Sequence, residues 1–493
     1  MSLTKKVISG VSWSAVAQIG QRATSLVVTA ILARQLSPED FGLIALTLLA
    51  VNFFTYFHDM GLSSALVQRA ELREEHLTTA FWLNIGAGII LALIGVALSR
   101  PIAMVFREPR VAPLLKVLMV TFLINGFGWV SYALLQRKFK FREIAIIESG
   151  GNLVAGITGI TLALAGAGVW ALVAQQIAMS LMLTCGRLFT ARWSPRFRFS
   201  FQSARELFSF SLSALGYFVV SHGVRSVDNA FVGAVLGATA LGYYALAYNL
   251  ILMPGMTICV LIGRVMFPVL SSVQDDMVRF RQAYLRMART VTSATFPLII
   301  GLGSAAPLFV TTIYGEKWAA VVPVLRILIV IGFFEATGFW GVAVWALGKT
   351  KITFILALVS LILMTVAFSI GVRWGLLGVA WAYVIISPVI FILPHMLASR
   401  LMKLRLGDYL GAIAPPLFAS LVMGFIIALS IERGIQLFAS RWLNLLAYIT
   451  AGACIYSTVL IGIAIVNKGE RGIISWLMGR HLSELEGQPQ NVH

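Results

Sequence analysis

Charged residues are scarce in this sequence. Asp, Glu, Lys and Arg make up 12% of the 493 residues, whereas hydrophobic residues make up 59%. A soluble domain has roughly 25% charged residues, so this composition excludes an ordinary soluble protein. The apolar residues form runs long enough for helices that cross a bilayer, which takes about 20 residues each. We therefore predict an all-α, polytopic membrane protein.

Cysteines and catalytic motifs are scarce as well. The three cysteines, Cys185, Cys259 and Cys454, lie far apart inside apolar runs, which excludes a disulfide framework and a zinc site. The segment 343–350 resembles a phosphate-binding loop, but Ala343 replaces its first glycine and it ends an apolar run rather than following a strand. No HExxH or GxSxG sequence occurs, and no hydrophilic loop could hold a soluble active site. We expect no enzyme, no catalytic residue, no metal and no bound cofactor.

The net charge of +18 does not indicate a nucleic-acid partner. The basic residues lie in short loops between apolar runs and form no basic domain with interleaved aromatic residues. Basic loops such as 137–142 alternate with loops that lack Lys and Arg, such as 164–168. The positive-inside rule then predicts a cytoplasmic N-terminus.

The apolar runs give fourteen candidate spans, an even number that places both termini in the cytoplasm. They cover residues 7–33, 41–67, 77–99, 113–135, 144–165, 168–190, 208–235, 241–263, 290–310, 321–347, 352–372, 376–399, 410–431 and 442–466.

The two halves of the chain share an internal repeat. Leu36, Gly42, Ala45 and Leu46 match Leu236, Gly242, Ala245 and Leu246 at an offset of 200, and Pro113, Lys116 and Leu118 match Pro323, Arg326 and Leu328 at an offset of 210. Six spans are an even number, so two six-helix lobes would be related by a pseudo-two-fold axis along the membrane normal. We predict an N-lobe at 1–205, a C-lobe at 206–405, and two extra helices with a cytoplasmic tail at 406–493.

A segment near 275–289, inside the C-lobe, has apolar residues at helical spacing and arginines on its other faces. This pattern predicts a cytoplasmic amphipathic helix that lies in the headgroup layer. It could simply anchor a linker on anionic lipid, or it could help to gather a lipid substrate.

The first span of each copy carries a polar stripe. In the first copy the stripe is Ser14, Gln18, Arg22, Ser25 and Thr29, and in the second it is Ser221, His222, Arg225, Asp228 and Asn229. A charged residue at mid-membrane costs roughly 2.5 to 3.5 kcal/mol on insertion scales and normally faces a protein interior or an aqueous cavity. We therefore predict a central cavity to which Arg22, Arg225, Gln18, Ser25, His222 and Asn229 contribute.

The deep acidic residues leave two readings open. Asp228 could neutralise Arg225 three residues away on the same helix, or it could take part in transport. Asp59 could cap a half-helix after a break, and Glu335 could be a proton or cation site or a structural residue. His222 could equally be a packing residue or a proton-coupling group.

Several motifs resemble one family. The sequences RQLSPEDFGLIAL (34–46), HDMGLSSALVQR (58–69), VDNAFVGAVLGATALGYYALAYNL (227–250) and MFPVLSSVQDD (266–276) are similar to the polysaccharide-export branch of the multidrug/oligosaccharidyl-lipid/polysaccharide exporter superfamily. The resemblance extends over spans 1 to 12. Asp228 matches the aspartate of span 7 in that family.

The resemblance implies a flippase in a bacterial inner membrane that moves undecaprenyl-pyrophosphate-linked sugar repeat units by alternating access. Its partners would be the lipid-linked oligosaccharide, membrane lipids and a downstream polymerase or export machinery, and a proton or sodium gradient could drive it. Two alternatives stay open. A drug/cation antiporter of the same superfamily would require lone deep carboxylates in an aromatic-rich cavity, whereas a membrane-embedded glycan polymerase or ligase would require a sizeable periplasmic loop.

Overall fold

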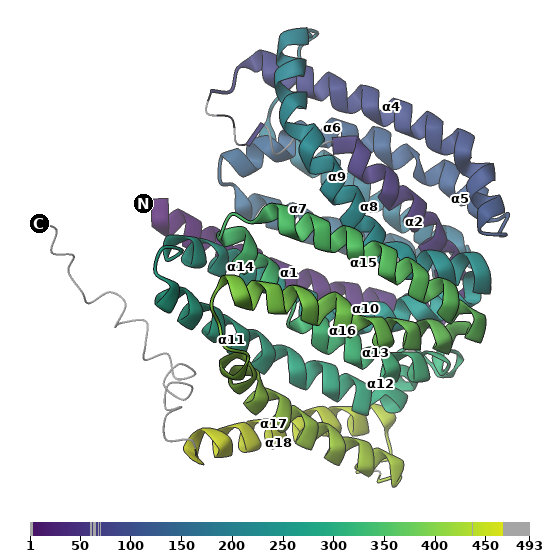
Figure 1. Cartoon of the computed structure of the whole chain (residues 1–493). Coiled ribbons are helices and arrows are strands. Elements are labelled where there is room, and N and C mark those ends of the chain that lie inside the picture. Colours follow the sequence, from purple (N-terminus) through teal and green to yellow (C-terminus); the bar gives the residue numbers. More distant parts are fainter. Residues whose placement is uncertain are drawn as a thin grey trace, which may run out of the picture. The chain divides into compact units, whose positions relative to one another are not determined.

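A computed structural model describes residues 3–59, 62, 66–67, 69, 71–435 and 437–466. These residues form helices joined by short turns and contain no strand, which confirms the predicted all-α class (Figure 1). The helices are α1 (Leu3–Gln35), α2 (Pro38–Asp59), α4 (Glu74–Val105), α5 (Val111–Leu118), α6 (Val120–Arg137), α7 (Phe141–Leu164), α8 (Val169–Ala191), α9 (Phe201–Phe231), α10 (Gly237–Ser272), α11 (Met277–Ser304), α12 (Ala306–Ile313), α13 (Val321–Ala336), α14 (Trp340–Ala346), α15 (Thr350–Gly371), α16 (Gly375–Leu401), α17 (Leu406–Glu432) and α18 (Arg441–Val466). The π-helical turn η1 (Val232–Leu236) and the 3-10 turns η2 (Glu316–Trp318) and η3 (Val372–Trp374) connect some of them.

In the part of the chain that the structure describes, ten segments are long and apolar enough to cross a membrane. The count rises to eleven if α11 and α12, which meet at 79°, form one bent span. Two of the segments contain 40 and 51 residues and each covers two helices, α9 with α10 and α15 with α16. Since about 20 residues suffice for one crossing, the predicted fourteen spans are compatible with this count.

The helices form two compact units. Unit 1 contains Met1–Leu250, Ile313–Leu328 and Lys349–Leu393, and unit 2 contains Ile251–Thr312, Ile329–Gly348 and Pro394–His493. Within unit 1, α7 packs against α1 and α8, and α9 packs against α2, α4 and α15. Within unit 2, α17 lies between α11 and α18. These two units do not coincide with the predicted lobes at 1–205 and 206–405. The division into two lobes remains a prediction.

The predicted amphipathic segment 275–289 is helical and forms the first half of α11. Asp276 caps this helix, because its side chain accepts hydrogen bonds from the backbone amides of Val278 and Arg279 at 3.0 and 3.1 Å. The apolar residues of the segment, Phe280, Tyr284, Met287 and Ala288, are buried inside the protein. The apolar face of the segment packs on protein, and its place in the headgroup layer remains a prediction.

The start of α2 shows why the motif LSPED has its composition. Ser37 is the N-cap, and its hydroxyl accepts the Asp40 amide at 3.1 Å. The Asp40 carboxylate in turn accepts the Ser37 amide at 2.9 Å, which completes a capping box. Pro38 occupies the first helical position, where the missing N–H costs nothing.

Two glycines of the repeat allow an unusually close backbone contact in unit 1. A Cβ atom on Gly42 would lie 1.7 Å from the carbonyl oxygen of Ala238. A Cβ atom on Gly242 would lie 1.9 Å from the carbonyl oxygen of Pro38. Only glycine fits at either position. We call this contact among Pro38, Gly42, Ala238 and Gly242 the glycine seam.

Candidate functional site

Asp228 is the most deeply buried acidic residue of the predicted site. Its side chain is 1% exposed and belongs to α9. One carboxylate oxygen accepts the Tyr244 hydroxyl at 3.1 Å, and the other accepts the Asn229 backbone amide at 2.7 Å. Asp228 therefore ties α9 to α10, while Arg225 is exposed on α9. Asp228 is thus hydrogen-bonded inside unit 1, and Arg225 is accessible.

His222 lies on a different part of α9. Its ring is 4.8 Å from the ring of Tyr56 on α2, and the Ser226 hydroxyl is 3.4 Å from a ring nitrogen. His222 and Ser226 border an otherwise apolar cavity of about 560 Å³ in unit 1. The other lining residues come from α2, α4, α9 and α15, together with Phe106 at the end of α4: Leu49, Ala50, Phe53, Phe54, Leu98, Pro101, Ile102, Val105, Phe106, Gly223, Val227, Ala230 and Leu361.

The polar stripe of α1 keeps three of its predicted residues in accessible positions. Arg22 and Ser25 are exposed and Gln18 is half-buried. Their neighbour Gln21 faces α7. Its side-chain amide donates to Glu148 at 3.5 Å, and its backbone carbonyl oxygen accepts the side-chain amide of Asn152 at 3.1 Å. One face of α1 thus packs on α7, and the stripe of Gln18, Arg22 and Ser25 lies on a different face of α1.

The structure adds a cation that the sequence analysis did not select. The guanidinium of Arg187 on α8 lies 4.5 Å from the ring centre of Tyr132 and 5.9 Å from that of Trp129, both on α6. Such cation–π contacts contribute about 0.5 to 2 kcal/mol. Glu148 is close enough to interact electrostatically with Arg187. The signal in the sequence was two aromatic residues three positions apart in span 4 and an arginine near the end of span 6.

A buried histidine continues this polar group across unit 1. Trp129 donates its indole N–H to Nδ1 of His58 at 3.2 Å, so Nε2 carries the proton of a neutral ring. Nε2 lies 3.3 Å from the carbonyl oxygen of Asn84 and can donate to it. Both nitrogens are used in holding α2, α4 and α6 together. The adjacent Asp59 ends α2, and its predicted capping partner lies outside the described residues.

Glu335 belongs to unit 2. It is half-buried near the end of α13, and the Cys259 thiol lies 4.0 Å from its carbonyl oxygen. In the ranges the structure describes, no three His, Cys, Asp or Glu residues are close enough to hold a metal ion.

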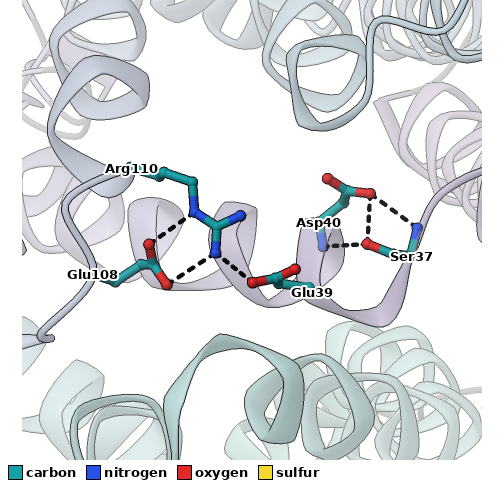
Figure 2. Close-up of polar contacts among 5 residues, drawn as sticks. All are labelled: Ser37, Glu39, Asp40, Glu108 and Arg110. Atoms are coloured by element: carbon teal, nitrogen blue, oxygen red, sulfur yellow. Dashed lines mark hydrogen bonds and ion pairs between the residues drawn. The ribbon is translucent and has the colours of Figure 1, made fainter.

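A charged cluster surrounds the start of α2 (Figure 2). Arg110 donates to both carboxylate oxygens of Glu108, at 2.9 and 3.2 Å, and also to Glu39. The Arg110 hydrogen bonds hold the pKa of Glu108 below its ordinary value and raise the pKa of Arg110. The cluster fixes the turn between α4 and α5 against the first turn of α2.

The turn 315–318, far away in the sequence, docks on the end of α1 in the same unit. Trp318 is fully buried and donates its indole N–H to the carbonyl oxygen of Ala33 at 2.8 Å. Lys317 donates to the carbonyl oxygens of Arg34 and Leu36 at 3.0 and 2.6 Å, which satisfies the open end of α1. Burial lowers the pKa of Lys317, and the nearby Asp40 carboxylate opposes this effect.

The Trp318 ring packs edge-on against two residues that flank the glycine seam. Its centre lies 5.2 Å from the Phe41 ring and 6.0 Å from the Tyr243 ring. Residues from α1, α2, α10 and the turn before α13 thus meet at one end of unit 1, with little space between their backbones. Arg22 and Arg225, in contrast, are exposed.

These features define an all-helical, multi-pass membrane protein with polar residues inside its helix bundle. A model of the family described as polysaccharide biosynthesis protein matches residues 31–323, more than half of the chain. The chain belongs to this family, as the sequence motifs predicted.

Curated relatives cover almost the whole chain. The teichuronic acid biosynthesis protein TuaB of Bacillus subtilis is 29% identical over 93% of this chain and 96% of its own length. The lipopolysaccharide biosynthesis protein WzxC of Escherichia coli is 28% identical over 87% of this chain and 89% of its own. Among solved structures, the lipid II flippase MurJ in an inward closed conformation is 18% identical, with a TM-score of 0.76 over 92% of this chain and 99% of that one. At this identity the MurJ likeness shows the fold alone.

Proposed function

We propose that the protein is a flippase for undecaprenyl-pyrophosphate-linked polysaccharide repeat units in a bacterial inner membrane. Its family and its relatives in teichuronic acid and lipopolysaccharide biosynthesis support a transporter rather than an enzyme. The observation that carries the proposal is the pair of exposed arginines, Arg22 and Arg225, on the first helix of each repeat. A pyrophosphate headgroup brings at least two negative charges, and arginine offers a planar fork of donors to each phosphate.

Alternating access requires one end of the path to be closed while the other is open. The glycine seam, with Trp318 buried beside it, supports a closed state at the end of unit 1 where α1 finishes and α2 begins. On the positive-inside rule this end would face the periplasm, with both termini in the cytoplasm. Cysteines placed at Ser37 and Thr239, in a chain without its native cysteines, should react with impermeant reagents from the periplasm. Reaction only after permeabilisation would reverse the orientation.

The substrate test uses charge reversal at the two arginines. We expect Arg22→Glu and Arg225→Glu to repel the headgroup, so that lipid-linked repeat units accumulate on the cytoplasmic face. Arg→Lys keeps the charge but loses the bidentate geometry and should retain part of the activity. Arg100→Glu, at an exposed arginine of α4, is the matched control and should export normally. Normal export by both α1 and α9 variants at wild-type protein levels would reject the headgroup site.

His222 and the apolar cavity beside it would lie next to the polar stripe of α9. We assign Gln18, Ser25, His222 and Asn229 to sugar or headgroup contacts. A polymerase or export complex would take the delivered repeat unit on the far side of the membrane, because a flippase leaves its product attached to the lipid.

A further inference from the structure

The turn between α13 and α14 lies in unit 2. α13 ends at Ala336 and α14 begins at Trp340, and the amides of Thr337 and Gly338 turn back to the carbonyl oxygens of Phe334 and Glu335, both at 3.1 Å. Non-helical backbone inside a membrane is tolerated only where it is buried in protein or lines a cavity. In transporters such breaks commonly supply the carbonyl groups of ion sites.

Three buried aromatic residues from three other helices gather next to this break. The rings of His395 on α16 and Tyr409 on α17 lie 4.0 Å apart, and the Tyr284 ring on α11 lies 6.3 and 6.4 Å from them. Phe339, in the break, packs 5.5 Å from Tyr284. All three polar rings are more than nine-tenths buried. The cluster therefore lies in the interior of unit 2.

Most polar atoms of this cluster lack protein partners. Among the buried side-chain N or O atoms of the described ranges that make no hydrogen bond are Nε2 of His395 and the hydroxyls of Tyr284 and Ser399, whereas the Tyr409 hydroxyl has the Thr337 side chain beside it. Ser399 is one turn after His395 on the same face of α16. A buried polar group without a partner costs about 1 to 3 kcal/mol, so three in one place require an explanation.

A chain of titratable groups leads from the cluster to Glu335. Tyr409 lies near Thr337 and near the Cys259 thiol. Cys259 contacts the carbonyl oxygens of Glu335 and Ala336 at 4.0 and 3.9 Å, and its thiol also interacts electrostatically with the Glu335 carboxylate. Each of the five helices α10, α11, α13, α16 and α17 contributes one titratable residue to this chain.

One cation near the cluster on α11 is already engaged. Arg281, three residues before Tyr284, donates to the carbonyl oxygen of Lys403 at 2.9 Å. The titratable groups recorded in contact with the cluster are thus Tyr284, Tyr409 and, through Tyr409, Cys259 and Glu335.

We propose that His395, with Tyr284, Tyr409 and Glu335, forms a proton site that couples transport to the proton gradient. His395 takes up one proton at Nε2 to become an imidazolium and releases it later in the cycle, while the phenol hydroxyls serve as hydrogen-bond partners. A proton fits better than sodium, because hard cations prefer oxygen ligands and the ring nitrogen is central to the cluster. This assignment rests on the proposed flippase function.

The transport test uses the purified full-length protein in liposomes with undecaprenyl pyrophosphate that carries one fluorescent sugar. A gradient of one pH unit is expected to shift the wild-type distribution of this probe between leaflets up to about tenfold if one proton moves per cycle. His395→Asn cannot take up the proton, so the probe should equilibrate without a shift. Tyr456→Phe removes a buried hydroxyl of the same unit that donates to the Ser293 carbonyl oxygen, and it should respond as the wild type does.

Two outcomes would overturn the proton site: a full pH response in His395→Asn, or a wild-type shift that follows a sodium gradient and ignores pH. If the wild type does not move the probe at all, the flippase function fails instead. Histidine NMR of the solubilised protein then still decides the site. The ring signal that disappears in His395→Asn should titrate reversibly in the folded protein, and a signal that never titrates before unfolding rejects the proposal.

Discussion

The close contact in the glycine seam predicts that adding one methyl group, in Gly42→Ala, will separate the backbones at one end of unit 1. Non-bonded atoms essentially never come closer than 3.0 Å to a Cβ, whereas a Cβ on Gly42 would lie 1.7 Å from the Ala238 oxygen. The two backbones must therefore separate by roughly 1.3 Å in Gly42→Ala. Because the obstacle is backbone and not a flexible side chain, we place the cost at the upper end of the 1 to 3 kcal/mol range for overpacking. A penalty of about 3 kcal/mol reduces the closed population by about 150-fold relative to an open state.

Maleimide labelling of a buried cysteine measures this change. Ala33 is fully buried, and its carbonyl oxygen accepts the Trp318 indole. In a chain whose three native cysteines are replaced, a cysteine at Ala33 should react only when the end of unit 1 opens. Gly42→Ala should then raise the labelling rate by the factor given above, and Gly242→Ala should act in the same direction.

The control is Gly86→Ala on α4, where a new Cβ meets no atom within 4 Å. Both substitutions gain the same helix propensity, about 1 kcal/mol, so the comparison isolates the steric effect. Equal labelling rates in Gly42→Ala and Gly86→Ala would refute the idea that the close backbone approach holds this end closed.

Three further predictions concern neighbouring contacts. Trp318→Phe keeps an aromatic ring but loses the hydrogen bond to α1, so the closed state should weaken by about 1 kcal/mol, measured by the same labelling rate. The lowered pKa of Glu108 adds stability at neutral pH that is lost as the pH falls through that pKa. Since Arg110 is half-exposed, the pair contributes at most about 1 kcal/mol, and Arg110→Gln should flatten the acidic limb of a thermal unfolding profile. Tyr244→Phe leaves one oxygen of buried Asp228 without its donor and should cost about 1 to 3 kcal/mol of stability, which detergent-phase unfolding would detect. An unchanged midpoint would remove the structural role of this bond.

The sequence alone predicted the class of protein, because the length of an apolar run can be read along the chain without knowing how the helices pack. Runs of about 20 apolar residues predict membrane helices whatever their neighbours are. The apolar face of 275–289 was also visible in the sequence, but its surroundings were not. A helix face packed on protein and one packed on lipid headgroups have the same periodicity, so only the structure could place Tyr284 in an interior cluster.

The sequence predicted which residues belong to the candidate site, but it could not predict which residues they contact. The spacing of Arg225 and Asp228 suggested a pair along one helix, yet Asp228 is held by Tyr244, sixteen residues away. Arg187 was overlooked because its aromatic partner Tyr132 lies on a different helix. Contacts between helices depend on the rotation of each helix about its axis, which a span assignment does not supply.

The internal repeat accounts for one of these contacts between helices. In a contact across a two-fold axis, residue i of one copy meets residue j of the other, and j meets i. The glycine seam has this form, because Gly42 meets Ala238 and Gly242 meets Pro38, and positions 238 and 242 are the repeat equivalents of 38 and 42 at an offset of 200. Equivalent residues are thus brought together at one point by the duplication itself. A motif that must be glycine in both copies to let two backbones touch need not bind a ligand or catalyse a reaction.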